Sequence, residues 1–425
     1  MKLASYWHES APRFAAGSPA PVEGEVDVAI VGAGFTGLSA ALALARQGAR
    51  VAVLEAEQVG SGASGRNGGH CNNGLAHDFK GVADRLGLPT AAKLYRAFDA
   101  AVDTVERIVA EERIDCDFRR TGKIKFAAKP AHLDKLKRTQ ELLAREVDRD
   151  AHIVSPDQIR SEIGSDRFHG GLVLPRSAGM HMGKFAKGLA DAAVARGAAI
   201  FENAPVTRLT RLNGHAHEIA TPRGALHAKQ VLLATGASRI GPFARFRRRI
   251  VPICSFIIVT EPLPISLLDE LMPTRRMATD TRNVGNYFRI TPDNRLLFGG
   301  RARFAMSSPL SDAKSGKVLE KAMREVFPQL HSTRIDYCWG GIVDMTADRF
   351  PRAGEHDGLY YSMGYSGHGT QMSTHMGAVM AEVMAGRTAR NVFSDFDWPA
   401  IPGHFGPPWF LPFVGAYYRL QDVLH

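Results

Sequence analysis

Three glycines and one acid near the start of the chain have the types and the spacing of a phosphate and ribose site. Gly32, Gly34 and Gly37 form the pattern G-x-G-x-x-G, and Glu55 follows eighteen residues after Gly37. Such glycines allow a tight turn, let the backbone approach a pyrophosphate and let the next helix lie close to a sheet. The free N–H groups at a helix start attract phosphates, and a carboxylate at position 55 can accept both hydroxyls of an adenosine ribose. The pattern predicts a dinucleotide site. The carboxylate at position 55 disfavours a cofactor that carries a phosphate on the 2′-hydroxyl of its adenosine ribose.

A strand, a helix and a second strand must position this turn. Residues 26–31 are an apolar, β-branched run that suits a strand buried on both faces. Apolar residues from 38 to 45 recur at helical spacing, Gly48 ends the helix, and residues 51–54 form the second strand. We therefore expect a complete βαβ unit over residues 26–55.

Two further stretches are rich in glycine. Residues 60–74 (GSGASGRNGGHCNNG) hold six glycines and should be irregular backbone wrapped around a ligand, because glycine favours neither helix nor strand. Residues 364–369 (GYSGHG) form a glycine turn before a helical pattern. Three such stretches are more than a nicotinamide cofactor usually needs. Flavin adenine dinucleotide (FAD), which is longer and more fully buried, would use all of them.

Composition narrows the class of protein. The chain has 425 residues, 45% hydrophobic and 23% charged, which is ordinary for a globular protein with one large or two smaller domains. No long apolar run suggests a signal peptide or a transmembrane helix, so we expect a cytoplasmic protein. Four scattered cysteines should be reduced thiols, without metal-ligand spacing. The net charge is +10, but the basic run at 245–249 is better explained as a solvated face than as a nucleic-acid site.

Two insertions interrupt the nucleotide-binding pattern. The first should contain helices within 75–113, strands within 118–127 and a helix at 131–147. The second, at about 241–338, is rich in strand patterns and ends in a helix at 311–327. For the tail, 398–425, packing against the body is favoured over a membrane-surface helix, because prolines interrupt its apolar stretch. Between the insertions we expect a helix at 183–196 and strands at 199–203, 206–212, 217–221 and 230–233.

Three motifs give a more specific resemblance. They are G-A-S-G-R-N-G-G at 62–69, Y-F-R-x-T-P-D-N-R-L-L-F-G-G at 287–300 and G-Y-S-G-H-G at 364–369. The sequence resembles the D-amino-acid oxidase-like family of FAD-dependent oxidoreductases, and within it the amine oxidases of the gamma-glutamylputrescine and iminodiacetate type. The resemblance implies an α/β fold in which an FAD-binding Rossmann-like domain of glutathione-reductase type is interleaved with an antiparallel-sheet α+β substrate domain. It implies an FAD domain at 26–80, 165–240 and 340–390, a substrate domain at 81–164 and 241–339, and a tail at 391–425 packed on the body.

The resemblance also implies which residues bind FAD. The first glycine turn would meet the pyrophosphate, Glu55 the ribose, and the backbone of Val206 the adenine. The helix end at 367–371 would face the flavin pyrimidine, where the helix dipole stabilises negative charge on the reduced ring. Cys71 lies beside the flavin loop, but relatives with this loop generally hold FAD non-covalently. The implied cofactor residues are Gly32, Gly34, Phe35, Thr36, Gly37, Glu55, Ser64, Gly65, Arg66, Asn67, Gly68, Gly69, Val206, Thr235, Gly236, Gly367, His368, Gly369, Thr370 and Gln371.

The implied activity is oxidation of a C–N bond. A primary or secondary amine that carries a carboxylate, such as gamma-glutamylputrescine, iminodiacetate or an N-substituted glycine, would give hydride to flavin N5. The imine would hydrolyse, and O2 would become H2O2. No side chain needs to be a strong base if the amine arrives neutral. A lysine that activates oxygen in relatives such as sarcosine oxidase has no unambiguous counterpart. The alternatives are a D-amino-acid dehydrogenase that reduces quinone and a non-catalytic flavoprotein.

Several side chains are candidates for the substrate cavity. Tyr287 and Arg289 lie two apart on one expected strand and should face the same way, so a phenol and a carboxylate-binding guanidinium would share a cavity. A surface cross-strand pair is the alternative. Arg301 and Arg303 are rival anchors. Two further residues each have two open interpretations. Tyr365 either caps the substrate or is a core tyrosine. His70 either acts at the site, by tuning the flavin or binding the substrate, or is a loop histidine bonded to backbone.

Overall fold

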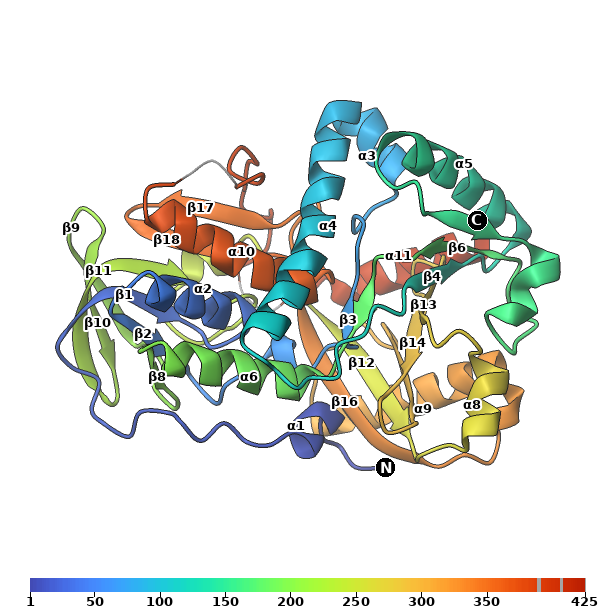
Figure 1. The fold of residues 1–425 in the computed structure, drawn as a ribbon, viewed down its shortest axis with the longest axis horizontal. Helices are drawn as coiled ribbons and strands as arrows, with labels where there is room; N and C mark the ends of the chain where they lie inside the picture. The colour runs from blue at the N-terminus through green and yellow to red at the C-terminus, as the bar shows by residue number, and fades with distance from the viewer. Residues whose placement is uncertain (388–390, 406–407, 425) are drawn as a thin grey trace.

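Two large β-sheets lie side by side in the molecule, with helices packed around them (Figure 1). The computed structural model describes residues 1–387, 391–405 and 408–424. Helix α4 stands between the two halves (Figure 1). The described α-helices are α1 (Tyr6–Ser10), α2 (Phe35–Arg46), α3 (Phe79–Leu86), α4 (Leu88–Glu111), α5 (Pro130–Glu146), α6 (Met182–Ala195), α7 (Ala244–Arg247), α8 (Ile265–Leu271), α9 (Pro309–Val326), α10 (Gly369–Met384) and α11 (Leu411–Leu424).

The first sheet contains the expected βαβ unit. Its strand order is β17-β18-β11-β1-β2-β8, and β10 and β9 extend it from β11. Strands β18, β11, β1, β2 and β8 run parallel to one another, which is the arrangement that dinucleotide-binding folds use. The strands are β1 (Glu25–Val31), β2 (Val51–Leu54), β8 (Ala199–Phe201), β9 (Arg208–Asn213), β10 (Ala216–Thr221), β11 (Gly224–Leu233), β17 (Arg352–His356) and β18 (Leu359–Met363).

Both faces of the first sheet are covered, as the apolar run of β1 predicts. Val28 and Ile30 pack with the helices α2, α6 and α10, whereas Ala29 and Val31 point to a second cluster on the opposite face. This alternation follows from the two-residue period of a strand. It fixes the register of β1 and brings the end of that strand to the glycine turn that begins at Gly32.

The second sheet is formed by the insertions. Its order is β16-β12-β15-β14-β13-β4-β6-β5, and every pair is antiparallel except β13 with β4. One face packs on a separate core with α8 and α9, and the other faces the first half of the molecule. The expected α/β fold with an added antiparallel sheet is confirmed. The strands are β4 (Lys123–Phe126), β5 (His152–Val154), β6 (Gly171–Leu174), β12 (Val251–Thr260), β13 (Met277–Asp280), β14 (Asn286–Ile290), β15 (Leu296–Gly300) and β16 (Ile335–Met345).

Individual elements lie close to their expected positions. The helices expected at 131–147, 183–196 and 311–327 are α5, α6 and α9. Strands β6 and β16 belong to the second sheet, although the expected boundaries at 165 and 340 assign β6 and half of β16 to the FAD domain. The division into two domains stays a proposal, with these two strands moved to the second domain.

The two ends of the chain pack on the body. At the start, Trp7 of α1 is fully buried. At the other end, Asp422 of α11 accepts hydrogen bonds from the backbone N–H groups of Asn283 (2.7 Å) and Val284 (2.8 Å). Lys129 donates to the carbonyl oxygen of Asp422 at 2.8 Å. Helix α11 therefore lies against the second sheet near α5 (Figure 1), and residues 388–390, 406–407 and 425 of the expected FAD domain and tail lie outside the described residues.

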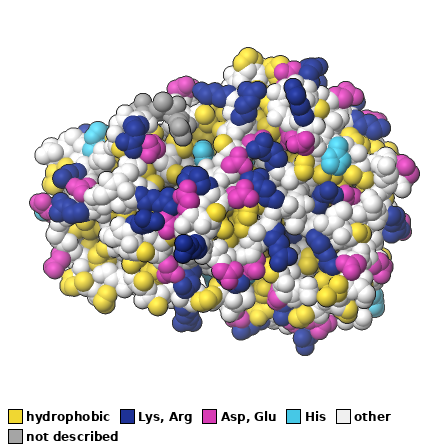
Figure 2. Space-filling model, in the orientation of Figure 1, with side chains coloured by type: hydrophobic (Ala, Val, Ile, Leu, Met, Phe, Trp, Pro, Cys, Tyr) yellow, Lys and Arg dark blue, Asp and Glu magenta, His cyan; other side chains and the backbone are white. Residues whose placement is uncertain are grey.

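The surface is mixed in charge. On the face shown in Figure 2, Lys and Arg side chains are interspersed with Asp and Glu rather than gathered in a single patch. Among the described residues, no helix combines the length and the apolar character needed to cross a membrane. All four cysteines, Cys71, Cys116, Cys254 and Cys338, are buried free thiols.

Candidate active site

The loop at 60–74 is held at the junction of the two halves. Its Ser64 hydroxyl accepts a hydrogen bond from the backbone N–H of Phe35 at 3.0 Å, which ties the loop to the start of α2. The indole N–H of Trp7 donates to the carbonyl of Asn67 at 2.7 Å, and that of Trp339 donates to the carbonyl of Arg66 at 3.0 Å. The loop is irregular as expected, apart from a short 3-10 turn, η1 (Ala63–Gly65), and the two-residue strand β3 (His70–Cys71).

The third glycine segment joins the same place. The Gln371 side chain of α10 donates to the carbonyl of Asn72 at 2.5 Å, and the Thr370 hydroxyl donates to Asn67 Oδ1 at 3.3 Å. Asp344 at the end of β16 accepts a hydrogen bond from the Gly364 N–H at 2.6 Å, and burial raises the pKa of Asp344 to about 6. Three glycine-rich segments that are far apart in sequence therefore meet at one site.

The first glycine turn has the close approaches that its spacing predicts. Gly32 has a φ of +107°, and a Cβ on it would lie 2.7 Å from the Ala234 carbonyl oxygen. A Cβ on Gly37 would overlap the Gly32 carbonyl oxygen, so α2 can only start this close to the strand with glycine there. Glu55 accepts a hydrogen bond from the Ala33 N–H at 2.7 Å, and burial raises its pKa.

Four polar atoms around the junction have no hydrogen-bond partner within the described part of the chain. They are His70 Nε2, Asn72 Oδ1, His368 Nδ1 and Gln371 Oε1. Buried polar groups in folded proteins are almost always paired, so these atoms point to a ligand with complementary polar groups. The open space at Gly367, where a Cβ would meet nothing within 4 Å, lies directly before α10. A nucleotide turn, an open helix start and four unpaired polar atoms together fit a polar dinucleotide cofactor.

A comparison with protein families identifies that cofactor. The sequence model of the family described as FAD dependent oxidoreductase (DAO) matches residues 27–383. The chain is an FAD-dependent oxidoreductase of this family. The family resemblance inferred from the three sequence motifs is therefore confirmed, as is FAD as the cofactor of this enzyme.

Relatives match most of the chain. The chain is 32% identical over 428 residues to gamma-glutamylputrescine oxidoreductase of Escherichia coli, with 99% of this chain and 98% of that protein covered. It is 33% identical over 393 residues to the probable oxidoreductase OrdL of Haemophilus influenzae, covering 89% and 87%. Among solved structures, glycine oxidase from Geobacillus kaustophilus superposes with a TM-score of 0.73 at 21% identity, covering 90% of this chain and 98% of that one.

Several of the residues expected to hold FAD lie around this junction, and some of them direct their side chains into the protein. The aromatic ring of Phe35 packs against Phe185, 5.0 Å between ring centres, and the Thr36 hydroxyl lies 2.8 Å from the hydroxyl of Tyr365. Both side chains point into the core, so these two residues can meet FAD only through backbone. Val206 is buried beyond β8, and Thr235 and Gly236 follow β11 beside the first glycine turn.

Three loop residues support the loop itself. Asn67 Oδ1 accepts a hydrogen bond from the Gly69 N–H at 2.8 Å, and the Asn67 amide donates to the Ser64 carbonyl at 2.9 Å. Arg66 Nε donates to the Ser61 carbonyl at 2.9 Å, and Ser5 donates to the Gly65 carbonyl at 2.9 Å. These bonds fix the backbone of the loop on both sides of Gly68.

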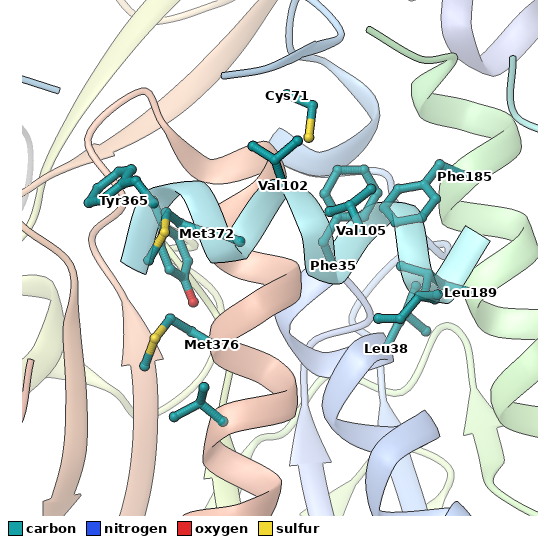
Figure 3. Close-up of a cluster of buried hydrophobic side chains, with 14 of the residues drawn as sticks. Phe35, Leu38, Cys71, Val102, Val105, Phe185, Leu189, Tyr365, Met372 and Met376 are labelled. Atoms are coloured by element: carbon teal, nitrogen blue, oxygen red, sulfur yellow. The ribbon is translucent and has the colours of Figure 1, made fainter. Parts of the chain in front are cut away.

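Tyr365 is a core residue, so the expectation that it caps the substrate is wrong. Its side chain is buried, and its hydroxyl lies 2.8 Å from both Thr36 Oγ1 and Ser362 Oγ. Figure 3 shows it beside Met372 and Met376 of α10. A side chain with both hydrogen bonds made inside the protein and methionines around it cannot also face a substrate.

Tyr287 and Arg289 face the same side of β14, as their spacing predicts, but they differ in what they contact. The Tyr287 hydroxyl lies 3.0 Å from Ser255 Oγ, and a Cβ on Gly68 would lie 2.7 Å from the tyrosine ring. Burial raises the pKa of Tyr287 to about 12. Tyr287 therefore stands against the flavin loop and stays a candidate for the substrate cavity.

Arg289 is engaged elsewhere. Its Nη1 donates to the carbonyls of Gly69 at 2.6 Å and Met180 at 3.0 Å, its side chain is buried, and burial lowers its pKa to about 10. A cavity of about 290 Å³ borders Arg289, but residues 60–74 and 364–371 do not line it. Arg289 holds the flavin loop, which corrects the expectation that it anchors the substrate.

His70 and His368 both lie at the junction of the two halves. Burial lowers the pKa of His70 and of His368 well below the usual value. The His70 ring lies 5.6 Å from that of Tyr287, and its Nε2 lacks a hydrogen-bond partner in the described chain, which leaves this nitrogen available to the flavin or the substrate. Arg301 is half-buried, and its Nη1 lies 3.4 Å from the Asn283 carbonyl; Arg303 is half-buried on the following loop.

Lys123 is a residue at this site that sequence reasoning missed. Its side chain is buried, and its Nζ donates to the Asn73 carbonyl at 3.1 Å. Burial and the neighbouring Lys125 lower the pKa of Lys123 to about 7. The alternation K-I-K in a short strand pattern was the available signal, because it puts two lysines on the face opposite the buried Ile124.

Proposed function

We propose that this enzyme is an oxidase that acts on the C–N bond of a primary or secondary amine carrying a carboxylate. The observation that carries the proposal is the set of unpaired polar atoms beside the flavin loop, His70 Nε2, Asn72 Oδ1 and Gln371 Oε1. Two are carbonyl oxygens, which accept hydrogen bonds from the N–H groups of an amine. The similarity to gamma-glutamylputrescine oxidoreductase over nearly the whole chain supports the same substrate class.

The protein's own part in the reaction is binding and orientation. When bound, FAD accepts the two electrons of C–N oxidation and passes them to O2, which becomes H2O2. Asn72 and Gln371 would orient the amine, and Tyr287 would close the side toward the second sheet. The burial that lowers the pKa of His70 and His368 would also disfavour an ammonium ion relative to an uncharged amine at this place. The amine then needs no obligatory side-chain base, and the imine formed is hydrolysed by water.

The position of Cys71 supports non-covalent FAD. Its thiol is fully buried, and burial raises its pKa, so it is not a reactive thiolate. On β3 it points away from His70, toward Val102 of α4 (Figure 3). Buried free thiols also support a cytoplasmic location.

Two measurements test the proposed function. The purified protein should be yellow and release FAD on acid denaturation. Mixed without oxygen with a panel of amines that includes gamma-glutamylputrescine, iminodiacetate and sarcosine, it should lose its flavin absorbance with at least one of them. Admitting air should restore the colour and give peroxide. Bleaching that quinone but not air reverses would favour a dehydrogenase, and no bleaching by any amine would contradict the proposal.

A further inference from the structure

A cavity of about 290 Å³ lies behind the flavin loop, with Arg289 in its wall. The two-residue strand β7 (Ala178–Gly179) separates this cavity from the loop, because Gly179 pairs with His70 of the loop on one side and with Arg119 on the other. Gly179 and Arg119 line the cavity, whereas the flavin loop and the segment before α10 do not. The cavity is therefore separate from the junction where the three glycine-rich segments meet.

The guanidinium of Arg289 reaches this cavity with one nitrogen unused. Its Nη1 donates to the carbonyls of Gly69 and Met180, and the side chain is buried. Within the described residues its Nη2 makes no hydrogen bond and no acid pairs with it. The group lies against Gly179, where a Cβ would be 3.0 Å from Nη2. Buried guanidinium groups are normally matched by carboxylates or phosphates, so Nη2 is open to an anion in the cavity.

Arg275 brings a second incompletely paired guanidinium to the cavity from another part of the chain. It lies in the turn after α8 and lines the same cavity. Its Nη2 pairs with Asp269, whereas its Nη1 is buried and has no hydrogen-bond partner in the described chain. The backbone of Arg275 has a φ of +55°, in the left-handed region, and its N–H donates to the Met272 carbonyl at 3.0 Å. This turn holds the side chain at the cavity.

Positive charge exceeds negative charge around the cavity. The charged residues that line it are Asp117, Arg119, Arg275 and Arg289. The acid among them is already paired, because Lys184 lies 2.8 Å from the Asp117 carboxylate. Arg275 has an acid of its own, but neither Arg119 nor Arg289 forms an ion pair among the residues that the structure describes. Two positive charges therefore remain for a ligand to match.

Apolar side chains complete the walls. Met277 is buried and Ile265 of α8 is 63% exposed, so the cavity runs from a buried end to the surface. Pro292 also lines it. A ligand that matches these walls has a hydrocarbon part as well as negative charge, and inorganic phosphate has only the charge.

We propose that this cavity binds a short dicarboxylate, an organic acid whose two carboxylates are joined by a few CH2 groups. The unpaired Nη groups of Arg275 and Arg289 donate to the carboxylates, and the apolar side chains contact the carbon chain. The exposed Arg119 adds positive charge. The site takes no part in the proposed amine oxidation and does not depend on it. Arg289 connects the site to the flavin loop at Gly69.

Calorimetry on the FAD-loaded enzyme tests this site. Glutarate, a short dicarboxylate, should bind the wild type, and Arg275→Gln should raise its Kd about tenfold or more, because hydrogen bonds between charged groups are lost. Arg138→Gln removes the same charge from an exposed position of α5 and is the matched control, with the Kd of the wild type. Butyrate, with a single carboxylate, and inorganic phosphate should each bind about tenfold more weakly than glutarate.

Ile265→Glu tests the location without altering an arginine, and decides the matter if Arg275→Gln fails to fold. Ile265 is exposed, and a glutamate at the first residue of α8 brings negative charge to the cavity while suiting the helix start. This variant should raise the glutarate Kd about fivefold or more, whereas the neutral Ile265→Gln should change it less than about twofold.

Two results would overturn the site. One is a wild-type enzyme that binds no glutarate. The other is equal glutarate affinity in the wild type, Arg275→Gln and Ile265→Glu, which would place the dicarboxylate elsewhere, such as in the substrate cavity. Neither result depends on whether an amine bleaches the flavin, so the site and the proposed function are tested separately.

Discussion

At the scale of residues, a buried guanidinium without a carboxylate partner holds the flavin loop. Arg289 reaches across from β14 to the carbonyls of Gly69 and Met180, and its neighbour Tyr287 touches the same loop at Gly68. A charged donor makes stronger hydrogen bonds to carbonyls than a neutral one, and each carbonyl left unpaired by its loss costs about 1–3 kcal/mol. The conformation of the flavin loop at Gly69 therefore depends on this arginine of the second sheet.

The first prediction concerns this arginine. Arg289→Lys should weaken FAD binding about tenfold or more, because a lysine cannot reach both carbonyls with a fixed fork. KM for the amine should change less than FAD affinity. Equilibrium dialysis of FAD and steady-state kinetics at saturating FAD measure the two effects. Arg119→Lys, an exposed neighbour on the Gly179 side, is the control. A large KM increase with normal FAD affinity would restore Arg289 as the substrate anchor.

A second prediction concerns the buried Lys123. Its pKa of about 7 in the folded state lies below the usual 10.5, so the unfolded chain binds more protons than the folded chain between these values. The contribution of Lys123 to folding stability should therefore rise with pH in this range. Between pH 7 and pH 9 the unfolding free energy of the wild type should increase by about 2 kcal/mol relative to Lys123→Met. Urea unfolding at both pH values measures this difference, and a constant difference would show that Lys123 titrates normally.

At the scale of elements, the start of α2 is fixed by its contact with α10. A Cβ on Gly377 would overlap the Thr36 carbonyl oxygen, and Ser39 Oγ donates to the Thr374 carbonyl at 2.6 Å. The two helices touch backbone to backbone, and both begin at the FAD site. Their relative position sets the distance between the pyrophosphate turn and the segment at 367–371.

The third prediction tests this helix contact. Gly377→Ala should push α10 away from α2 and destabilise the fold by about 1–3 kcal/mol, because a well-packed contact has no room for another carbon. FAD affinity should fall as well. Gly62→Ala is the control, since a Cβ there would meet nothing within 4 Å. Urea unfolding and FAD titration measure both effects, and a Gly377→Ala protein as stable as the control would contradict the backbone contact.

The sequence predicts those features of the fold that depend on local pattern. The βαβ unit, helices α5, α6 and α9, and the irregular loop at 60–74 follow from periodicity and glycine content. Side-chain partners between distant segments do not follow from such patterns. The spacing shows that Tyr287 and Arg289 share one face of a strand. It does not show that the guanidinium of Arg289 would donate a hydrogen bond to the backbone carbonyl of Met180. Nothing near Tyr365 in sequence indicates its bond to Thr36, 329 positions away.

At the scale of the whole molecule, the flavin loop links the two halves. It is bonded to α2 of the first half through Ser64, and to the second sheet through Trp339 and Arg289. The N-terminal segment adds a third attachment through Trp7. A cofactor bound at this junction contacts groups from both sheets and therefore stabilises their arrangement as well as its own site.

The last prediction follows from this position of FAD. A ligand that binds only the folded state at a hundred times its Kd adds about 2.7 kcal/mol of stability, so the FAD-loaded protein should melt several degrees above the apoprotein. Removal of FAD should also speed hydrogen exchange in residues 60–74 and 364–371, because both segments would lose the contacts that we propose they make with the cofactor. Backbone amides of β9 and β10, at the far edge of the first sheet, serve as an internal reference and should exchange at the same rate in both forms. If exchange rose equally in β9 and in the loop, FAD would stabilise the protein globally rather than by ordering the junction of its two halves.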